Sequence, residues 1–102
     1  MHIAAGNYLD RSTGSVYIEI GKSKIYFHER KIVAIVVAGT LYRQKEFAEG
    51  IVYKRVRAAV MNSEARHVTE ITRQEMQDMA VGLIMQEVSE EMDKRLVRKK
   101  EN

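Results

Sequence analysis

The stretch Lys31-Ile-Val-Ala-Ile-Val-Val37 is apolar at odd and even positions alike, and it constrains the fold more than any other part of the chain. Side chains alternate between the two faces of a strand, so neither face of this one suits contact with water. A chain of 102 residues with few helices must therefore cover both faces of its sheet. We expect a second copy of the chain to provide part of that cover.

A hairpin precedes this stretch and determines which residues face each other. Ile20-Gly-Lys-Ser23 has the pattern of a two-residue turn with glycine at its first loop position, as a type II′ turn prefers. The turn predicts two cross-strand pairs on each face of the hairpin. They are Val16–Phe27 and Ile18–Ile25 on one face, and Tyr17–Tyr26 and Glu19–Lys24 on the other.

The order of the segments predicts an α+β fold, with strands first and helices after them. Four strands joined by short turns favour an antiparallel meander. Their expected bounds are roughly His2–Leu9, Ser15–Ile20, Ser23–His28 and Lys31–Ala38. Gly39 then ends the sheet and no linker-like segment follows, so residues 1–102 are expected to form a single domain.

A first helix is expected over Thr40–Asn62, with Gly50 as a weak point in its interior. One side of it is expected to be apolar and the opposite side to be basic. The apolar side would hold Phe47, Ile51, Val56, Ala59 and Val60, with Tyr53, Lys54 and Arg57 turned away. A polar connection follows, and Val68–Ile71 has the character of an extended segment.

The start of the second helix carries the clearest local signal. Thr72-Arg-Gln-Glu75 is a capping box, and Ile71 and Met76 have the spacing of a hydrophobic staple. Both devices predict a helix that begins at Thr72.

Apolar residues on this second helix form two stripes on nearly opposite sides. The first stripe is Met76, Met79, Ala80, Leu83 and Ile84, and the second is Val81, Met85, Val88, Met92 and Leu96. We expect the first stripe to pack on the sheet or the first helix, and the second to form the interface of a homodimer or higher oligomer. The alternative is that one subunit covers both stripes, one with its first helix and the other with its sheet.

Composition excludes several classes of protein. The chain is 45% hydrophobic and 30% charged, as in folded domains and unlike disordered ones. No apolar run approaches the roughly 20 residues that span a bilayer, and the start of the chain lacks the pattern of a signal peptide. The absence of cysteine removes disulfides and thiolate metal sites. We therefore expect a cytoplasmic protein without a membrane partner.

Motifs of catalysis are also missing from the sequence. The six glycines are scattered and form neither a Walker loop nor a dinucleotide fingerprint. His2, His28 and His67 lack the spacing of metal ligands, and the serines lack the strand–turn–helix setting of a nucleophile. We expect no catalytic residue, no bound metal and no cofactor.

Candidate binding residues are aromatic or basic. The hairpin face that holds both tyrosines and a lysine resembles sheets that stack bases and contact phosphates, although Val33, Ile35 and Val37 on the same face favour burial. The basic tail, Lys94–Lys100, follows the acidic segment 87–93, so it also suits a solvated helix end that complements the helix dipole. The candidates are Tyr17, Lys24, Tyr26, Tyr53, Lys54, Arg57, Arg95 and Arg98.

These features favour a non-catalytic, homo-oligomeric binding or regulatory protein. It would act through a protein partner or through an anionic small ligand held at a subunit interface. A compact chain without Cys, Pro or Trp also suits a bacterial or phage accessory protein. One alternative is a nucleic-acid-binding module that uses the basic helix face and the basic tail. The other alternative is a small enzyme with a site between subunits.

Overall fold

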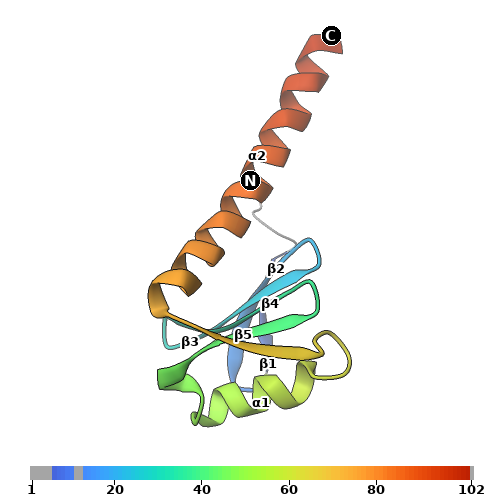
Figure 1. Cartoon of the computed structure of the whole chain (residues 1–102). Coiled ribbons are helices and arrows are strands. Elements are labelled where there is room, and N and C mark those ends of the chain that lie inside the picture. The colour runs from blue at the N-terminus through green and yellow to red at the C-terminus, as the bar shows by residue number, and fades with distance from the viewer. Residues whose placement is uncertain (1–5, 11–12, 102) are drawn as a thin grey trace.

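The chain forms one six-stranded mixed sheet with a helix on each face (Figure 1). The computed structural model describes residues 6–10 and 13–101, and the side chains of Leu9, 13–86 and Val88. The strands lie in sequence order and are β1 (Gly6–Asp10), β2 (Ser15–Ile20), β3 (Ser23–His28), β4 (Lys31–Val37), β5 (Thr40–Gln44) and β6 (His67–Ile71). The helices are a 3-10 turn η1 (Lys45–Phe47), α1 (Ile51–Val60) and the long α2 (Arg73–Glu101).

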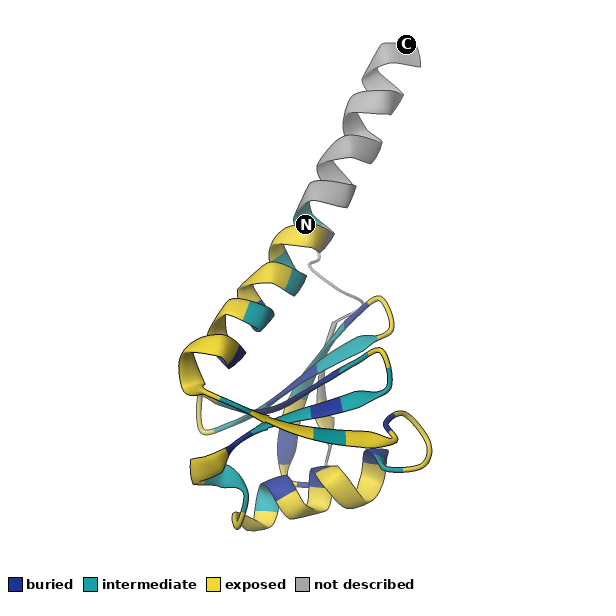
Figure 2. Cartoon of the chain, viewed as in Figure 1, coloured by how far each residue is buried: buried dark blue, intermediate teal, exposed yellow. Residues whose placement is uncertain are grey.

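Both faces of the sheet are covered by helices of the same chain. On one face Leu41 and Val36 pack against Val56 and Val60 of α1, and all four side chains are at most 3% exposed. On the other face Ile25 and Ile35 pack in one cluster with Met76 and Ala80 of α2. Figure 2 shows the resulting buried residues along the middle strands and on the inner side of α1. The two helices of one chain therefore cover the middle strands on opposite faces, and a contribution of a second copy to this cover stays a prediction.

The β2–β3 hairpin has the predicted register. Val16 pairs with Phe27, Tyr17 with Tyr26, Ile18 with Ile25 and Glu19 with Lys24. The turn takes its positive φ at Gly21 (φ +59°), the position at which a type II′ turn needs it. The prediction of the hairpin is confirmed residue by residue.

The assignment of faces along β4 is partly wrong. Ile35 was expected on the face of the two tyrosines, but it lies opposite Ile25 and packs towards α2. The cause is a register shift: Tyr26 pairs with Ala34 and Phe27 with Ile32, which leaves Val33 as an extra residue. Such a bulge moves every later side chain to the other face of the strand.

The expected helix over Thr40–Asn62 is also wrong in its first part, because Thr40–Gln44 is strand β5. Ala38 and Gly39 take positive φ angles of 47° and 81°, so the chain reverses there and continues the sheet instead of leaving it. Leu41 is fully buried in the cluster under α1, and Tyr42 faces the cluster under α2. Alternation of this kind favours a strand over a helix.

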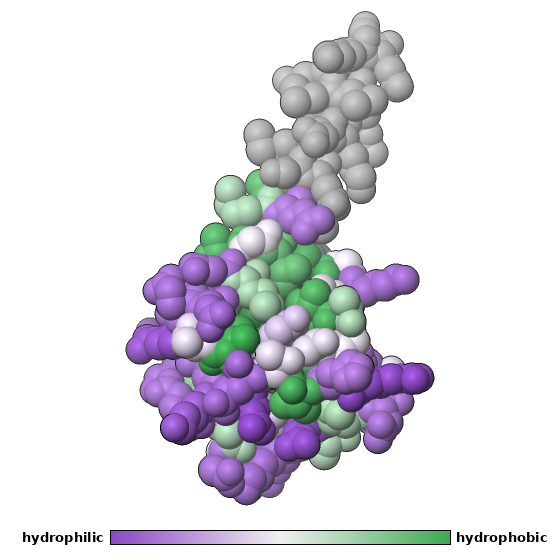
Figure 3. Space-filling view, viewed as in Figure 1, coloured by the Kyte–Doolittle hydropathy of each residue, from purple (hydrophilic) through white to green (hydrophobic). Residues whose placement is uncertain are grey.

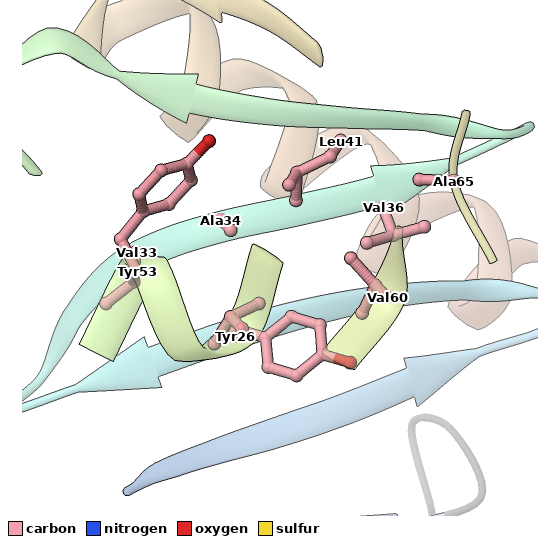
Figure 4. Close-up of a cluster of buried hydrophobic side chains, with 9 residues drawn as sticks. Tyr26, Val33, Ala34, Val36, Leu41, Tyr53, Val60 and Ala65 are labelled. Carbon is pink, nitrogen blue, oxygen red and sulfur yellow. The ribbon is translucent and has the colours of Figure 1, made fainter. Parts of the chain in front are cut away.

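Helix α1 therefore begins at Ile51, and its buried side agrees with the expected one at Val56 and Val60 but includes Tyr53 in place of Ile51 and Ala59. Tyr53, Val56 and Val60 are at most 1% exposed, whereas Ile51 is 63% exposed. The spacing of the three buried residues, i, i+3 and i+7, places them on one side of a helix. Figure 4 shows Tyr53 and Val60 directed towards the strands that carry Tyr26, Ala34 and Leu41.

The meander is extended at one edge by a parallel strand. Residues 67–71 form β6, as their extended character predicted, and β6 lies parallel to β5 with Gln44 opposite Ile71. Helix α1 and its following loop make the crossover between these two strands, as parallel pairs require. The predicted antiparallel meander of four strands is therefore present, but the sheet has two more strands, β5 and β6, and one parallel pair. The expected first strand corresponds to β1 within the described residues, and its part at residues 2–5 lies outside them.

Helix α2 begins where the capping box predicts. The Thr72 backbone N–H donates to Glu75 Oε1 at 2.9 Å, and the Glu75 backbone N–H donates to Thr72 Oγ1 at 3.1 Å. The hydrogen bonds from Thr72 lower the pKa of the Glu75 carboxyl. Ile71 and Met76 meet in the cluster beneath α2, as a hydrophobic staple requires.

We expect Thr72→Ala to destabilise the fold by about 1 kcal/mol, because it removes the acceptor for the Glu75 N–H. The midpoint of thermal unfolding would fall by about 4 °C. Thr72→Ser is the matched control, since it keeps the hydroxyl and should leave the midpoint within about 1 °C of the original. Equal midpoints for the alanine and serine variants would show that the cap contributes nothing.

Candidate functional site

The side of α2 that faces away from the sheet carries an apolar stripe, here called the outer stripe and defined by Val81, Met85 and Val88. Val81 is 59% exposed and Met85 is 58% exposed, while Val88 is half-buried. The opposite side of the same helix, with Met76 and Ala80, is buried on the sheet. The prediction of two stripes is thus confirmed for the described side chains, and the sheet covers only the first of them. In Figure 3 apolar surface gathers where α2 approaches the sheet, and hydrophilic residues predominate around α1.

Helix α2 extends far past the sheet (Figure 1). Its 29 residues correspond to roughly 43 Å at 1.5 Å per residue, and the chain measures 54 × 27 × 26 Å. A helix that leaves its packing surface has marginal stability in water, since most helix stability in proteins comes from a packed apolar face. A long projecting helix with an apolar stripe therefore favours association with another helix.

Four predicted residues lie in the distal part of α2. Met92 and Leu96 were assigned to the oligomer interface, and Arg95 and Arg98 to anion binding. Their backbone is helical, but their side chains lie outside the described part of the structure. Their roles stay predictions.

Tyr17, Lys24 and Tyr26 come together on one face of the hairpin, as predicted. The two rings lie 5.3 Å apart between centroids, and Lys24 Nζ lies 5.1 Å from the centroid of the Tyr17 ring. Tyr26, however, is only 3% exposed, and Lys24 forms an ion pair with Glu64 from the loop after α1. Burial alone would lower the pKa of the Lys24 amine, but Glu64 raises it overall. With one ring buried and the amine paired, this cluster forms part of the core beneath α1 and offers no open stacking surface.

Tyr53 likewise belongs to the core, although it contributes to the wall of a hollow of about 260 Å³ beside α1. Its ring is 1% exposed and lies 5.8 Å from Arg43 Cζ. The Tyr53 hydroxyl raises the pKa of the Arg43 guanidinium, with Glu70 adding to the effect. Arg43 Nε lies 3.6 Å from a Glu70 carboxylate oxygen across the β5–β6 pair, so this arginine already has an acidic neighbour.

The basic residues of α1 do lie on its solvent side. Lys54 and Arg57 are exposed, and Lys54 Nζ is 3.3 Å from a Glu49 carboxylate oxygen. They are separated from Tyr17 and Tyr26 by the body of α1, so the predicted residues whose side chains the structure describes do not form one site.

A cleft that the sequence analysis did not anticipate lies between the β3–β4 turn, η1 and the start of α2. Its volume is about 310 Å³. Three cationic side chains and one carboxylate line it. The rest of the lining is uncharged and consists of two phenylalanines, an isoleucine and two glutamines. These residues are Arg30, Lys31, Arg73, Phe27, Phe47, Ile32, Gln44, Gln77 and Glu46, and we call the hollow the corner cleft.

A side-chain hydrogen bond and a strained turn shape this cleft. Gln44 is 5% exposed, and its Nε2 donates to the Ile32 carbonyl oxygen at 3.2 Å. Glu29 and Arg30 form the β3–β4 turn with φ angles of 51° and 66°. This left-handed region costs a residue with a Cβ roughly 1–2 kcal/mol, and turns of this type favour Asn-Gly. Strained residues that persist next to a hollow are a reason to look for function there.

Sequence reasoning missed the corner cleft because its charged residues come from separate segments. Arg30 lies in a turn and Lys31 begins β4, where both resemble ordinary solvated residues, and Arg73 follows the cap of α2. The available signal was the Glu29-Arg30 pair in a tight reversal that normally uses glycine or asparagine. Their proximity to Arg73 depends on the packing of α2 on the sheet, which the sequence does not display.

Two further observations restrict the chemistry. Over the described residues, no group of three or more His, Asp or Glu side chains is placed to hold a metal ion. Over the same part of the chain, no helix combines the length and apolar character needed to cross a membrane.

Comparison with known proteins adds no assignment: no protein-family model, no curated protein and no solved structure matches this chain.

Proposed function

We propose that this chain is a non-catalytic binding protein that self-associates through α2. Two helices from two copies would pack with their outer stripes against each other and exclude water from Val81, Met85 and Val88. Spacings of four and three residues along this stripe suit the seam of a coiled coil. The assembly would present a rigid, helix-based scaffold to a protein partner or a small anionic ligand.

One observation carries the proposal: Val81 and Met85, the most exposed large apolar side chains in the described part of α2, lie one helical turn apart on the side turned away from the sheet. Single exposed apolar residues are common on protein surfaces and need no explanation. A row of them on a helix that extends beyond its own domain is different, because each turn adds apolar area to the same strip. Burial of about 25 cal/mol per Å² would favour pairing of such strips.

The absence of native cysteine makes the interface accessible to disulfide trapping. We expect at least one of the variants Val81→Cys, Met85→Cys and Val88→Cys to form a covalent dimer under mild oxidation, since equivalent residues near a two-fold axis lie close together. Gln86→Cys is the matched control, because Gln86 is exposed on another side of the same helix. If none of the three exceeds this control in the yield of covalent dimer, α2 does not pair through the outer stripe.

A further inference from the structure

We infer that the corner cleft binds a small phosphate monoester that carries a flat apolar group, with a nucleoside monophosphate as the representative of this class. The inference rests on the proposed function only in taking the chain to be a binding protein. Its test does not depend on self-association.

The charges of the corner cleft favour an anion. Arg30, Lys31 and Arg73 face a single carboxylate, Glu46, so the lining has a net charge of +2. Within the part of the chain that the structure describes, none of these three cations takes part in an ion pair. Lys24 and Lys54 differ in this respect, since Glu64 and Glu49 pair with them. Unpaired arginines beside a hollow are suited to bidentate contacts with phosphate.

The apolar part of the lining favours an organic phosphate over the bare ion. Phe27, Phe47 and Ile32 are each half-buried and line the same hollow as the three cations. A flat ring can pack on such aromatic surface while its phosphate reaches the guanidinium groups. The volume of about 310 Å³ is at the lower end of the range for small-molecule sites, which suits a mononucleotide and is too small for a dinucleotide.

The neighbouring hollow between β6 and α2 does not share this character. It is lined by three carboxylates, Glu46, Glu70 and Glu75, against Lys45 and Arg73. The backbone N–H groups of Thr72 and Glu75 are already used by the capping box, so the start of α2 is not itself the anion site. The cationic side chains and the aromatic wall define the proposed site.

The place of the cleft on α2 links it to the outer stripe. Arg73 and Gln77 line the cleft, and Val81 and Met85 continue the same row at steps of four residues. A ligand bound in the cleft would thus lie at one end of the strip that we propose as the interface.

The test is a titration of the ¹⁵N-labelled protein with adenosine 5′-monophosphate, followed by ¹H–¹⁵N correlation spectra. We expect saturable shifts centred on Arg30, Lys31 and Arg73, with half-saturation below about 1 mM. Adenosine and inorganic phosphate should each bind at least about 10-fold more weakly, because each lacks one of the two contacts. Equal binding of inorganic phosphate would overturn the assignment of an organic phosphate. Shifts centred on Lys54 and Arg57, or no saturable shift, would overturn the site.

Two variants make the test specific to the cleft. Arg73→Gln and Arg30→Gly should each weaken the binding of adenosine 5′-monophosphate by about 10-fold or more, since each removes a charged hydrogen-bond donor. Arg66→Gln, at the opposite end of β6, is the matched control and should bind as the original chain does.

Arg30→Gly also gives a readout that a merely structural role would not produce. Glycine accepts the φ of 66° without strain, so the midpoint of thermal unfolding should rise by about 4 °C while the affinity falls. A folded Arg30→Gly variant that binds the nucleotide as tightly as the original chain would contradict the proposal.

Discussion

Replacement of Met85 and Val88 by glutamate should convert the assembled protein into monomers. Both side chains lie on the outer stripe of α2, and pairing would place four carboxylates of two copies in an apolar seam. Burial of unpaired charges costs several kcal/mol, so we expect association to weaken by at least about 1,000-fold. The helix itself should persist, because both positions are more than two turns from the cap at Thr72. Light scattering measures the mass, and circular dichroism measures the helix content.

The control for this variant places the same charge on another side of α2. Gly82 and Gln86 are exposed, and a Cβ added at Gly82 meets nothing within 4 Å. The double variant Gly82→Glu, Gln86→Glu should therefore keep the mass of the original assembly. If the Met85→Glu, Val88→Glu variant also keeps that mass, the outer stripe is not the interface.

Tyr53→Ala should destabilise the fold by about 3–5 kcal/mol, as truncation of a large buried side chain usually does. Tyr53 is 1% exposed and packs in the cluster that joins α1 to Val33, Ala34 and Leu41. For a chain of 102 residues, a loss of this size is a large part of the total free energy of unfolding. Urea unfolding monitored by circular dichroism measures it.

Tyr53→Phe separates the ring from its hydroxyl. The hydroxyl lies beside the Arg43 guanidinium, whose pKa it raises, but it has no partner in hydrogen-bond geometry among the described residues, so its removal should change the free energy of unfolding by less than about 1 kcal/mol. If Tyr53 were instead a surface residue of a binding site, Tyr53→Ala would leave the stability nearly unchanged. That result would contradict the packing of α1 on the sheet.

Local signals in the sequence predicted the parts of the fold that depend on neighbouring residues. The Gly21-Lys22 turn determines the hairpin register, because a two-residue loop allows only one pairing. The Thr72–Glu75 capping box determines the start of α2, because its two hydrogen bonds join residues three apart. Both predictions could be made without knowledge of the rest of the chain.

The errors arise where distant segments decide the structure. The bulge at Val33 shifts the later side chains of β4 to the other face, and nothing within β4 marks it. Leu41 and Tyr42 become part of a strand because the reversal at Ala38-Gly39 pairs them with β4, and β6, about 27 residues later, pairs with them in parallel on the other side. The bulge and the pairing with β6 have no local sequence signature.

The candidate site likewise has one part that local sequence predicts and one part that depends on long-range packing. The outer stripe of α2 follows from helical spacing alone, and the structure leaves Val81 and Met85 exposed within one chain. The corner cleft brings Arg30 and Lys31 next to Arg73 only after α2 has packed on the sheet. Tyr26 and Tyr53 looked like binding residues in the sequence because their burial depends on the packing of α1 on the sheet, which the sequence does not display.

The most direct test of the account is the mass of the purified chain in solution. One chain has a mass of 11.8 kDa. Size-exclusion chromatography with light scattering should give at least twice this value, and the mass should fall towards that of one chain on dilution if the assembly is weak. A mass of one chain at every loading concentration, up to the limit of solubility, would contradict self-association through α2.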